Sequence, residues 1–397
     1  MIKLNDLLVL SAKKEASDIH LTAGLPPVLR IHKRLVYVGE EKLTQENIAE
    51  MIFSIMRDRQ KKLFYEKREY DFSYGVKGVA RFRINVFYQR GSIAAAFRRI
   101  PFEIPPLDSL GVPEIAHTLV NLERGLVLVT GPTGHGKSTT LASIIEEINK
   151  GKSKHIVTIE DPIEYLFQHK SSVIVQRELG TDTLSFPGAL RAVLREDPDV
   201  ILVGEMRDLD TIATALTAAE TGHLVFATLH TNSAAGAVPR LLDMGVEDFF
   251  IASTLNAVVA QRLVRKICPE CKEEYEPPKE IEEGLRKTLE DLAQNKTLML
   301  KDTETTKIVK TFMAKKKLSL YRGKGCSKCE GGYKGRVGIF ELLTMSERIS
   351  QATLDKSPAS KVQQIAIEEG MTTLIQEGYL RALEGSTSLE EVMRVTK

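Results

Sequence analysis

Eight consecutive residues of this chain have the types and spacing of a phosphate-binding loop. Residues 131–138 read Gly-Pro-Thr-Gly-His-Gly-Lys-Ser and fit the pattern G-x-x-x-x-G-K-[S/T]. Glycines let the backbone fold round phosphates so that its N–H groups face the anion. Lys137 is expected to reach the β- and γ-phosphates of ATP, and Ser138 to ligate Mg²⁺. The predicted nucleotide-binding residues are Gly131, Pro132, Thr133, Gly134, His135, Gly136, Lys137, Ser138 and Thr139.

The segments on either side of this loop support the same interpretation. Residues 126–130 form a short apolar, largely β-branched run, which predicts a buried strand. Residues 138–148 carry apolar side chains at helical spacing. A strand, the loop and a helix in this order form the context that the motif requires, so we prefer a phosphate site to a chance match.

Two glutamates follow predicted buried strands. Glu160 ends the run 156–159, and Glu205 follows the run 200–204. Ligands of parallel sheets bind at the carboxyl ends of the strands, and phosphoryl transfer to water needs a carboxylate and a metal. The second run resembles a Walker B strand, except that Gly204 stands where an Asp usually meets the Mg²⁺ shell. Glu205 therefore either serves the metal or activates water; capping of the next helix is the structural alternative for both glutamates.

Two histidines flank another predicted strand, 224–229. His230 follows its carboxyl end, where a side chain can contact the γ-phosphate and sense hydrolysis; a structural role is the alternative. His223 precedes the strand, lies at its opposite end, and is expected to be structural.

Three arginines near the N-terminus, Arg81, Arg83 and Arg98, are far from the phosphate loop in sequence. An arginine supplied by a neighbouring subunit can stabilise the γ-phosphate transition state. Taken alone, the residues fit better with the ordinary alternative, an exposed strand face with solvated arginines.

All four cysteines fall into two C-x-x-C pairs, Cys268 with Cys271 and Cys326 with Cys329. Four thiolates at tetrahedral corners leave no open position, so in a reducing cytosol they predict a structural zinc site. The intervening segment 272–325 is longer than usual zinc spacings. Two disulfides, unrelated free thiols and an iron–sulfur cluster are the alternatives.

The composition predicts a cytosolic protein of two or three domains. The chain has 397 residues, of which 43% are hydrophobic, and this is ample for packed cores. A net charge of +2 gives no basic excess for nucleic acid, so none is expected as a partner. No apolar run approaches the roughly 20 residues of a membrane span, and the N-terminus lacks the features of a secretory signal. If the protein acts at a membrane, we expect it to be held there by partner proteins.

Residues 1–103 are expected to form a small α+β domain, with a helical start, a β-rich stretch at 28–38 and a helix through 48–64. Prolines mark 104–112 as an extended linker.

Apolar strands and helices alternate after residue 113, which predicts an α/β domain at 113–397 with a mainly parallel sheet covered on both faces. Within it, 267–341 holds the tetracysteine module with a charged insertion, and 346–397 forms a helical subdomain. Strands are predicted at 126–130, 155–159, 172–176, 200–204 and 224–229, and helices at 138–149, 186–196, 209–221 and 234–243.

Four segments in order resemble the signature boxes of the type II/type IV secretion-system ATPases. The segments are the phosphate loop at 131–140, the Asp box at 158–164, the Walker B region at 195–208 and the His box at 217–231. The resemblance implies a PAS-like first domain, a RecA-like second domain and a homo-hexamer with nucleotide bound between the domains.

The same resemblance implies roles for particular residues. Glu160 matches the general base of the family, while Glu205 and His230 match its two other functional positions. It also implies that the first domain donates arginines to the nucleotide, which favours a catalytic role for Arg83 and Arg98.

The two ends of the chain are similar to different branches of this family. The first domain looks most like the ATPases that retract type IV pili, whereas the cysteine module and the tail look like those of pilus assembly and type II secretion. We favour a retraction motor at the cytoplasmic face of the inner membrane that acts through a pilus platform protein, because the long extra N-terminal region of assembly motors is missing. An extension or secretion ATPase is the alternative; a nucleic-acid translocase and a passive nucleotide-binding module are more remote.

Overall fold

The computed structural model divides into two compact units. The smaller comprises Met1–Ile104 with Pro162–Leu166, and the larger comprises Pro105–Asp161 with Phe167–Lys397. Residues 2–31, 34–100, 103–301 and 303–396 are described. Within those ranges no helix has the length and apolar character needed to cross a membrane.

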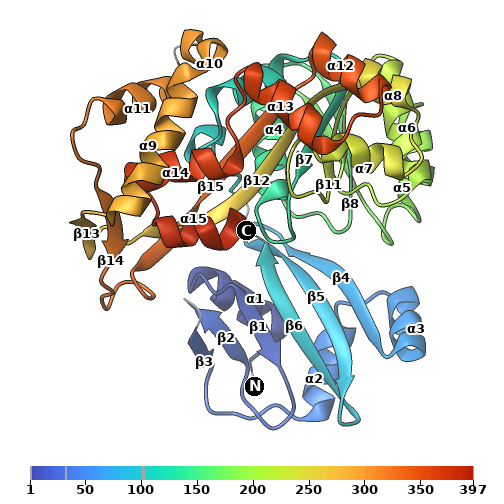
Figure 1. The fold of residues 1–397 in the computed structure, drawn as a ribbon. Coiled ribbons are helices and arrows are strands. Elements are labelled where there is room, and N and C mark those ends of the chain that lie inside the picture. The colour runs from blue at the N-terminus through green and yellow to red at the C-terminus, as the bar shows by residue number, and fades with distance from the viewer. Residues whose placement is uncertain (1, 32–33, 101–102, 302, 397) are drawn as a thin grey trace. The chain divides into compact units, whose positions relative to one another are not determined.

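The smaller unit is an antiparallel sheet with three helices (Figure 1). Its strand order is β3-β2-β1-β6-β5-β4. The strands are β1 (Asp18–Leu21), β2 (Val28–Ile31), β3 (Arg34–Tyr37), β4 (Glu69–Val76), β5 (Ala80–Gln89) and β6 (Ser92–Ile100). The helices are α1 (Leu4–Lys13), α2 (Gln45–Phe53) and α3 (Asp58–Lys67). The predicted helical start is confirmed, and β5 buries alternate residues over its first half.

The single helix predicted through 48–64 is wrong, because the structure has two helices there. The helical conformation is interrupted between Phe53 and Asp58. Met56, in this interval, is buried in the core and is 5% exposed. Arg57 takes an extended conformation, and its backbone N–H donates to Gln60 Oε1 at 2.8 Å. This contact begins a new helix, which helical periodicity alone does not reveal.

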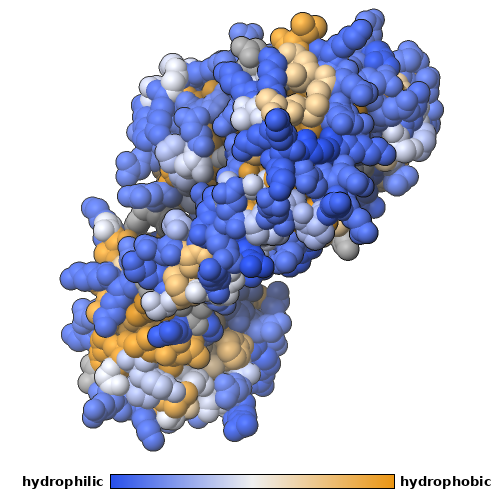
Figure 2. Space-filling view, turned by 60° about the vertical axis from the view of Figure 1, so that its left-hand side comes forward, coloured by the Kyte–Doolittle hydropathy of each residue, from blue (hydrophilic) through white to orange (hydrophobic). Residues whose placement is uncertain are grey.

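Hydrophobic side chains reach the surface of the smaller unit. Figure 2 shows them gathered there, whereas the visible face of the larger unit is mostly hydrophilic. Every residue of the edge strand β3 is exposed, including Leu35 and Val36.

The larger unit contains a seven-stranded sheet in the order β15-β12-β7-β11-β10-β8-β9. All neighbours are parallel except β15, which runs antiparallel to β12. The strands are β7 (Gly125–Thr130), β8 (His155–Glu160), β9 (Val173–Glu178), β10 (Val200–Val203), β11 (Leu224–Leu229), β12 (Leu255–Ile267) and β15 (Tyr333–Thr344). This sheet confirms the predicted α/β class and the five predicted strands.

Apolar clusters lie on both faces of this sheet. One face packs against α4 (Lys137–Gly151) through Leu141, Ile144 and Ile145. The other face packs against the remaining central helices. These helices are α5 (Phe186–Val193), α6 (Leu209–Glu220), α7 (Ala237–Asp243) and α8 (Asp248–Thr254). Short 3₁₀ turns at Leu107–Leu110 and Glu114–Asn121 precede the first strand.

A further apolar cluster joins the charged insertion to the C-terminal helices. Leu285, Leu289 and Leu292 form an apolar stripe on one face of the first insertion helix and are buried, whereas Ile281 is 37% exposed. The insertion contains α9 (Lys279–Gln294), α10 (Lys296–Leu300) and α11 (Glu304–Met313), set between the paired strands β13 (Lys272–Tyr275) and β14 (Leu320–Gly323). The tail is helical as predicted, with α12 (Glu347–Leu354), α13 (Ala359–Glu368), α14 (Leu374–Leu383) and α15 (Leu389–Thr396).

Candidate nucleotide site

The predicted phosphate loop connects β7 to α4 in the larger unit. Gly131 has a φ of +148° and Gly136 a φ of +84°, conformations that side chains disfavour. A Cβ on Gly131 would lie 2.5 Å from the backbone oxygen of Gln261. Only glycine fits there, so the loop is pressed against β12.

Lys137 is buried at the start of α4, with its ammonium inside the loop. Its Nζ donates to the carbonyl oxygens of Gly131 at 2.9 Å and of Pro132 at 3.1 Å. These contacts hold the cation where the N-terminus of a helix favours an anion. The arrangement suits a polyphosphate, with Ser138 next to the lysine at the position that serves Mg²⁺ in such loops.

Strand β12 braces the loop through contacts that the sequence did not suggest. Gln261 donates through Nε2 to the His135 carbonyl at 2.8 Å and accepts from Thr140 Oγ1 at 2.7 Å. The backbone N–H of Leu263 donates to His135 Nδ1 at 3.0 Å. Burial and then the charge of Arg262 lower the pKa of His135, which favours the neutral ring that this acceptor role requires.

The two predicted glutamates follow neighbouring parallel strands. β8 and β10 pair with Ile159 opposite Val203, so Glu160 and the segment leading to Glu205 leave the same edge of the sheet. Glu160 is 8% exposed, and its Oε1 accepts from Thr158 Oγ1 at 2.7 Å and Gln176 Nε2 at 3.2 Å. A carboxylate fixed in this way can orient a water molecule.

Glu205 is held at both of its carboxylate oxygens. His230 Nε2 lies 2.9 Å from Oε1, and Arg207 Nη2 donates to Oε2 at 2.6 Å. Burial opposes ionisation of Glu205, but the hydrogen bond and charge of Arg207, together with His230, hold the pKa of this carboxyl below its usual value. Arg207 was missed in the sequence; its only signal there is its position two residues after Glu205.

Gly204 is explained by the approach of the two strands. Its backbone N–H donates to the Ile159 carbonyl at 2.8 Å. A Cβ at this position would lie 3.2 Å from Glu160 Cα and 3.3 Å from Ile159 O. The aspartate usual at this point would press on the backbone that carries Glu160.

The arginines Arg83 and Arg98 belong to the smaller unit. They face each other across β5 and β6 as directly paired residues. The side chain of Arg98 is 75% exposed, and its Nε donates to Asp18 Oδ1 at 3.0 Å. Their role at the nucleotide stays a prediction.

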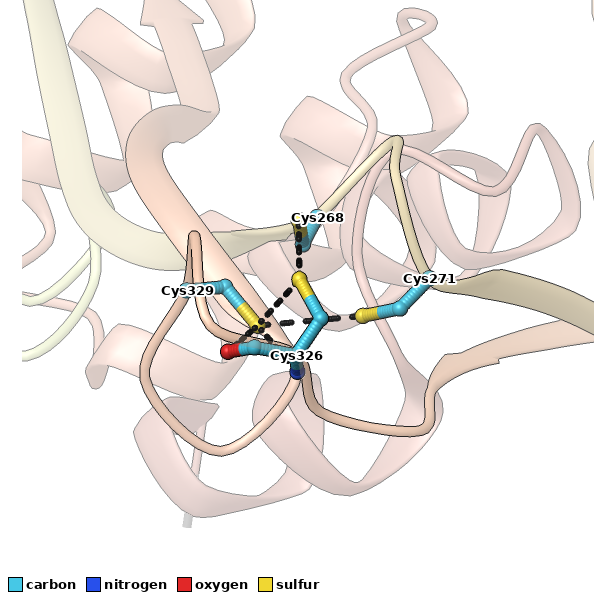
Figure 3. Close-up of side chains that lie close together, drawn as sticks. All are labelled: Cys268, Cys271, Cys326 and Cys329. Atoms are coloured by element: carbon cyan, nitrogen blue, oxygen red, sulfur yellow. Dashed lines mark hydrogen bonds between the residues drawn. The ribbon is translucent and has the colours of Figure 1, made fainter.

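The four cysteine sulfurs converge at the end of β12, as Figure 3 shows. All lie within 4.8 Å of one another, and three contacts measure 3.6 Å for Cys326–Cys329, 3.7 Å for Cys271–Cys329 and 3.9 Å for Cys268–Cys326. A disulfide needs about 2 Å, so these thiols are free. Zn–S bonds of about 2.3 Å place tetrahedral sulfurs about 3.8 Å apart. The donor set therefore fits a tetrahedral metal.

Known proteins give this geometry its context. The PilT ATPase of type IV pilus retraction in Pseudomonas aeruginosa is 48% identical over 270 residues, covering 66% of this chain and 78% of that protein. The type II secretion system ATPase E of Vibrio cholerae is 37% identical over 412 positions, covering 100% of this chain and 75% of that protein. A crystal structure of the pilus retraction motor PilT with bound ADP matches with a TM-score of 0.78 and 38% identity, covering 100% of this chain and 97% of that one.

The family model of the type II/IV secretion system proteins matches residues 106–394, which span the phosphate loop, the strand-end glutamates and the cysteine pairs. This match and the relatives give one answer: the chain belongs to the type II/IV secretion system protein family, and it is an ATPase.

Proposed function

We propose that this ATPase powers the retraction of type IV pili. The observation that carries the proposal is the match to the PilT retraction motor over the whole chain, with 97% of that protein covered. The 48% identity to the PilT of Pseudomonas aeruginosa supports the same assignment. The working form is a homo-hexamer at the cytoplasmic face of the inner membrane, where it turns a platform protein and withdraws pilin subunits.

The site residues divide the work of hydrolysis. Lys137 and the loop amides hold the β- and γ-phosphates, and Ser138 with Glu205 serves Mg²⁺, which neutralises charge on the phosphates when bound. Glu160 orients the attacking water and accepts its proton. His230, in contact with Glu205, responds to loss of the γ-phosphate. Arg83 and Arg98 approach the phosphates from a neighbouring subunit.

The domains are 1–103, a linker at 104–112, and 113–397.

The four cysteines bind zinc and keep the ends of the insertion together. Support comes from sulfur separations of 3.6 to 3.9 Å, which match a tetrahedral thiolate site. Four thiolates fill the coordination shell, so the zinc is structural and takes no part in hydrolysis.

A second function, pilus extension or type II secretion, is favoured by one observation. The Vibrio cholerae secretion ATPase aligns with the whole chain, cysteine module included. Loss of the gene separates the two: hyperpiliated cells that do not twitch indicate retraction, whereas cells without pili, or with blocked secretion, indicate the alternative.

Hydrolysis itself is tested with purified protein and the variant Lys137→Ala. The wild type should turn over ATP, and the variant, without the ammonium at the phosphates, should lose turnover while remaining folded by circular dichroism. Addition of polynucleotide should leave the rate unchanged. A salt-sensitive gain in rate with polynucleotide would instead indicate a translocase.

A further inference from the structure

The larger unit contains a pocket of about 270 Å³ where the insertion meets the C-terminal helices. α10 and α11 form one wall, β15 another, and the end of α13 with α14 a third. None of the described residues that line it belongs to the phosphate loop or is a strand-end glutamate. The pocket is therefore separate from the nucleotide site.

Most of the lining is hydrocarbon. Leu298 and Ile308 contribute from the insertion, Phe340 and Leu342 from β15, and Met371 from the segment before α14. Phe340 is 1% exposed and Leu298 3%, so each presents only a small part of its side chain to the pocket. A pocket of this size and lining suits a ligand with a small apolar body.

The polar part of the lining has an acidic surplus. Among the described lining residues there are four glutamates and two basic side chains. The glutamates are Glu114, Glu304, Glu369 and Glu377, and the bases are Lys301 and Arg381. Lys301 Nζ already donates to the Glu369 carbonyl at 3.1 Å.

Arg381 contacts the protein through each of its three side-chain nitrogens. Its Nε donates to Glu377 Oε1 at 3.0 Å, its Nη2 to the Gly111 carbonyl at 3.1 Å, and its Nη1 lies 3.6 Å from Glu384 Oε2. Two of these three partners are carboxylates, which offset the charge of the guanidinium and weaken its attraction for an anionic ligand.

Unlike Arg381, Glu377 has a polar atom without a protein partner among the described residues, because Arg381 donates only to its Oε1. It is 7% exposed, and no described residue donates a hydrogen bond to Oε2. Burial raises the pKa of Glu377, and Arg381 opposes this effect. Thr303, which lines the same pocket, has a buried Oγ1 without a hydrogen-bond partner among the described residues. A largely buried acceptor without a protein partner gains from a charged donor.

We propose that this pocket is a binding site for a small organic cation, a protonated amine on an apolar body. The ammonium donates to Glu377 Oε2 and Thr303 Oγ1, and the hydrocarbon packs on Phe340, Leu342 and Met371. The site touches the insertion, β15 and the segment before α14, so an occupant adds a further contact between the insertion and the end of the sheet. This inference is independent of whether the motor retracts or extends pili.

The test uses the full chain saturated with Mg-ADP, and calorimetric titration with phenethylamine. Phenethyl alcohol and phenylacetate are isosteric probes with neutral and negative heads. The amine should bind at least about tenfold more tightly than either, since a hydrogen bond between two charged groups is stronger than one with a neutral partner. Absence of amine binding, or equal binding of the alcohol, would overturn the proposal.

Variants then locate the bound amine. Glu377→Gln removes the acceptor charge, and Ile308→Phe fills the apolar end without touching a charge. Both should weaken binding about tenfold or more, whereas Glu283→Gln, on an exposed part of α9, should not. If Glu377→Gln does not fold, Ile308→Phe and Thr303→Val carry the test. Wild-type affinity in the folded pocket variants would refute the site.

Discussion

His230 Nε2 contacts Glu205 Oε1 at 2.9 Å, which joins the residue after β11 to the second residue of the loop after β10. The strands themselves are neighbours in the sheet, with Val203 opposite Ala227. Thr228 Oγ1 also donates to the Gly204 carbonyl at 2.6 Å. The two strand ends therefore form one hydrogen-bonded unit, and a displacement of either side chain must change the other.

Arg207 is expected to set the pH range in which Glu205 is ionised. Its hydrogen bond and charge lower the pKa of Glu205, so Arg207→Gln should raise that pKa toward its ordinary value. The ionised carboxylate is the working form and is lost as pH falls. The acid limb of kcat/KM for ATP should therefore move to higher pH in the variant.

The matched control for this experiment is Arg191→Gln, which breaks an exposed pair with Asp210. Its acid limb should coincide with that of the wild type. An unshifted limb in Arg207→Gln would show that Glu205 does not govern the acid side of the profile.

Removal of the charge of Glu160 and of Glu205 is expected to change different kinetic quantities. Glu160→Gln keeps the contact with Thr158 but cannot accept a proton, so kcat should fall by about 10²–10⁴ while ATP still binds. Glu205→Gln should instead raise the Mg²⁺ concentration needed for half-maximal rate. Steady-state hydrolysis and a fluorescent-nucleotide titration measure both. Equal rates for Glu160→Gln and wild type would remove Glu160 from the mechanism.

The parts of the fold that could be predicted are those where local pattern and burial agree. The runs 126–130 and 224–229 are apolar throughout and form the fully buried strands β7 and β11. His223 was expected to be structural at the amino end of β11, and its backbone oxygen accepts from Gly125 N at 3.0 Å. Motif spacing likewise placed Lys137 inside the phosphate loop.

The parts that could not be predicted depend on long-range pairing. β12 and β15 pair antiparallel although the whole insertion separates them in sequence. The local sequence of one strand does not indicate which distant strand will pair with it. The bracing of His135 by Gln261 depends on a second non-local pairing, that of β12 with β7, so it was missed as well. Glu341 is a further case: it is 2% exposed on β15, and its Oε1 accepts from Ala234 N at 2.7 Å.

The arginines of the smaller unit are expected to act on turnover, and only in an assembled ring. Arg83→Ala and Arg98→Ala should lower kcat by about 10³ or more and leave nucleotide affinity nearly unchanged, because the charge matters at the transition state. Arg90→Ala is the control, since this residue is exposed in the turn that joins β5 to β6.

Mixing the variants tests the sharing of sites between subunits. Hexamers of Arg98→Ala chains with Lys137→Ala chains should recover part of the activity, because some interfaces then combine an intact loop with an intact arginine. A monomer that hydrolyses ATP at the full rate would contradict shared sites.

The cysteine cluster is expected to hold one zinc per chain and to stabilise the insertion rather than catalysis. Strong chelation should lower Tm and expose α9–α11 to protease, because β13 and β14 are anchored beside the sulfurs through the Lys324 N–Cys271 O hydrogen bond of 3.0 Å. Cys326→Ser should reproduce this loss, while Ser327→Ala, between the second pair of cysteines, should not. Elemental analysis before and after chelation gives the metal content. Full stability in protein shown to be free of zinc would refute a structural metal, and the sulfur contacts of 3.6 to 3.9 Å would then reflect packing alone.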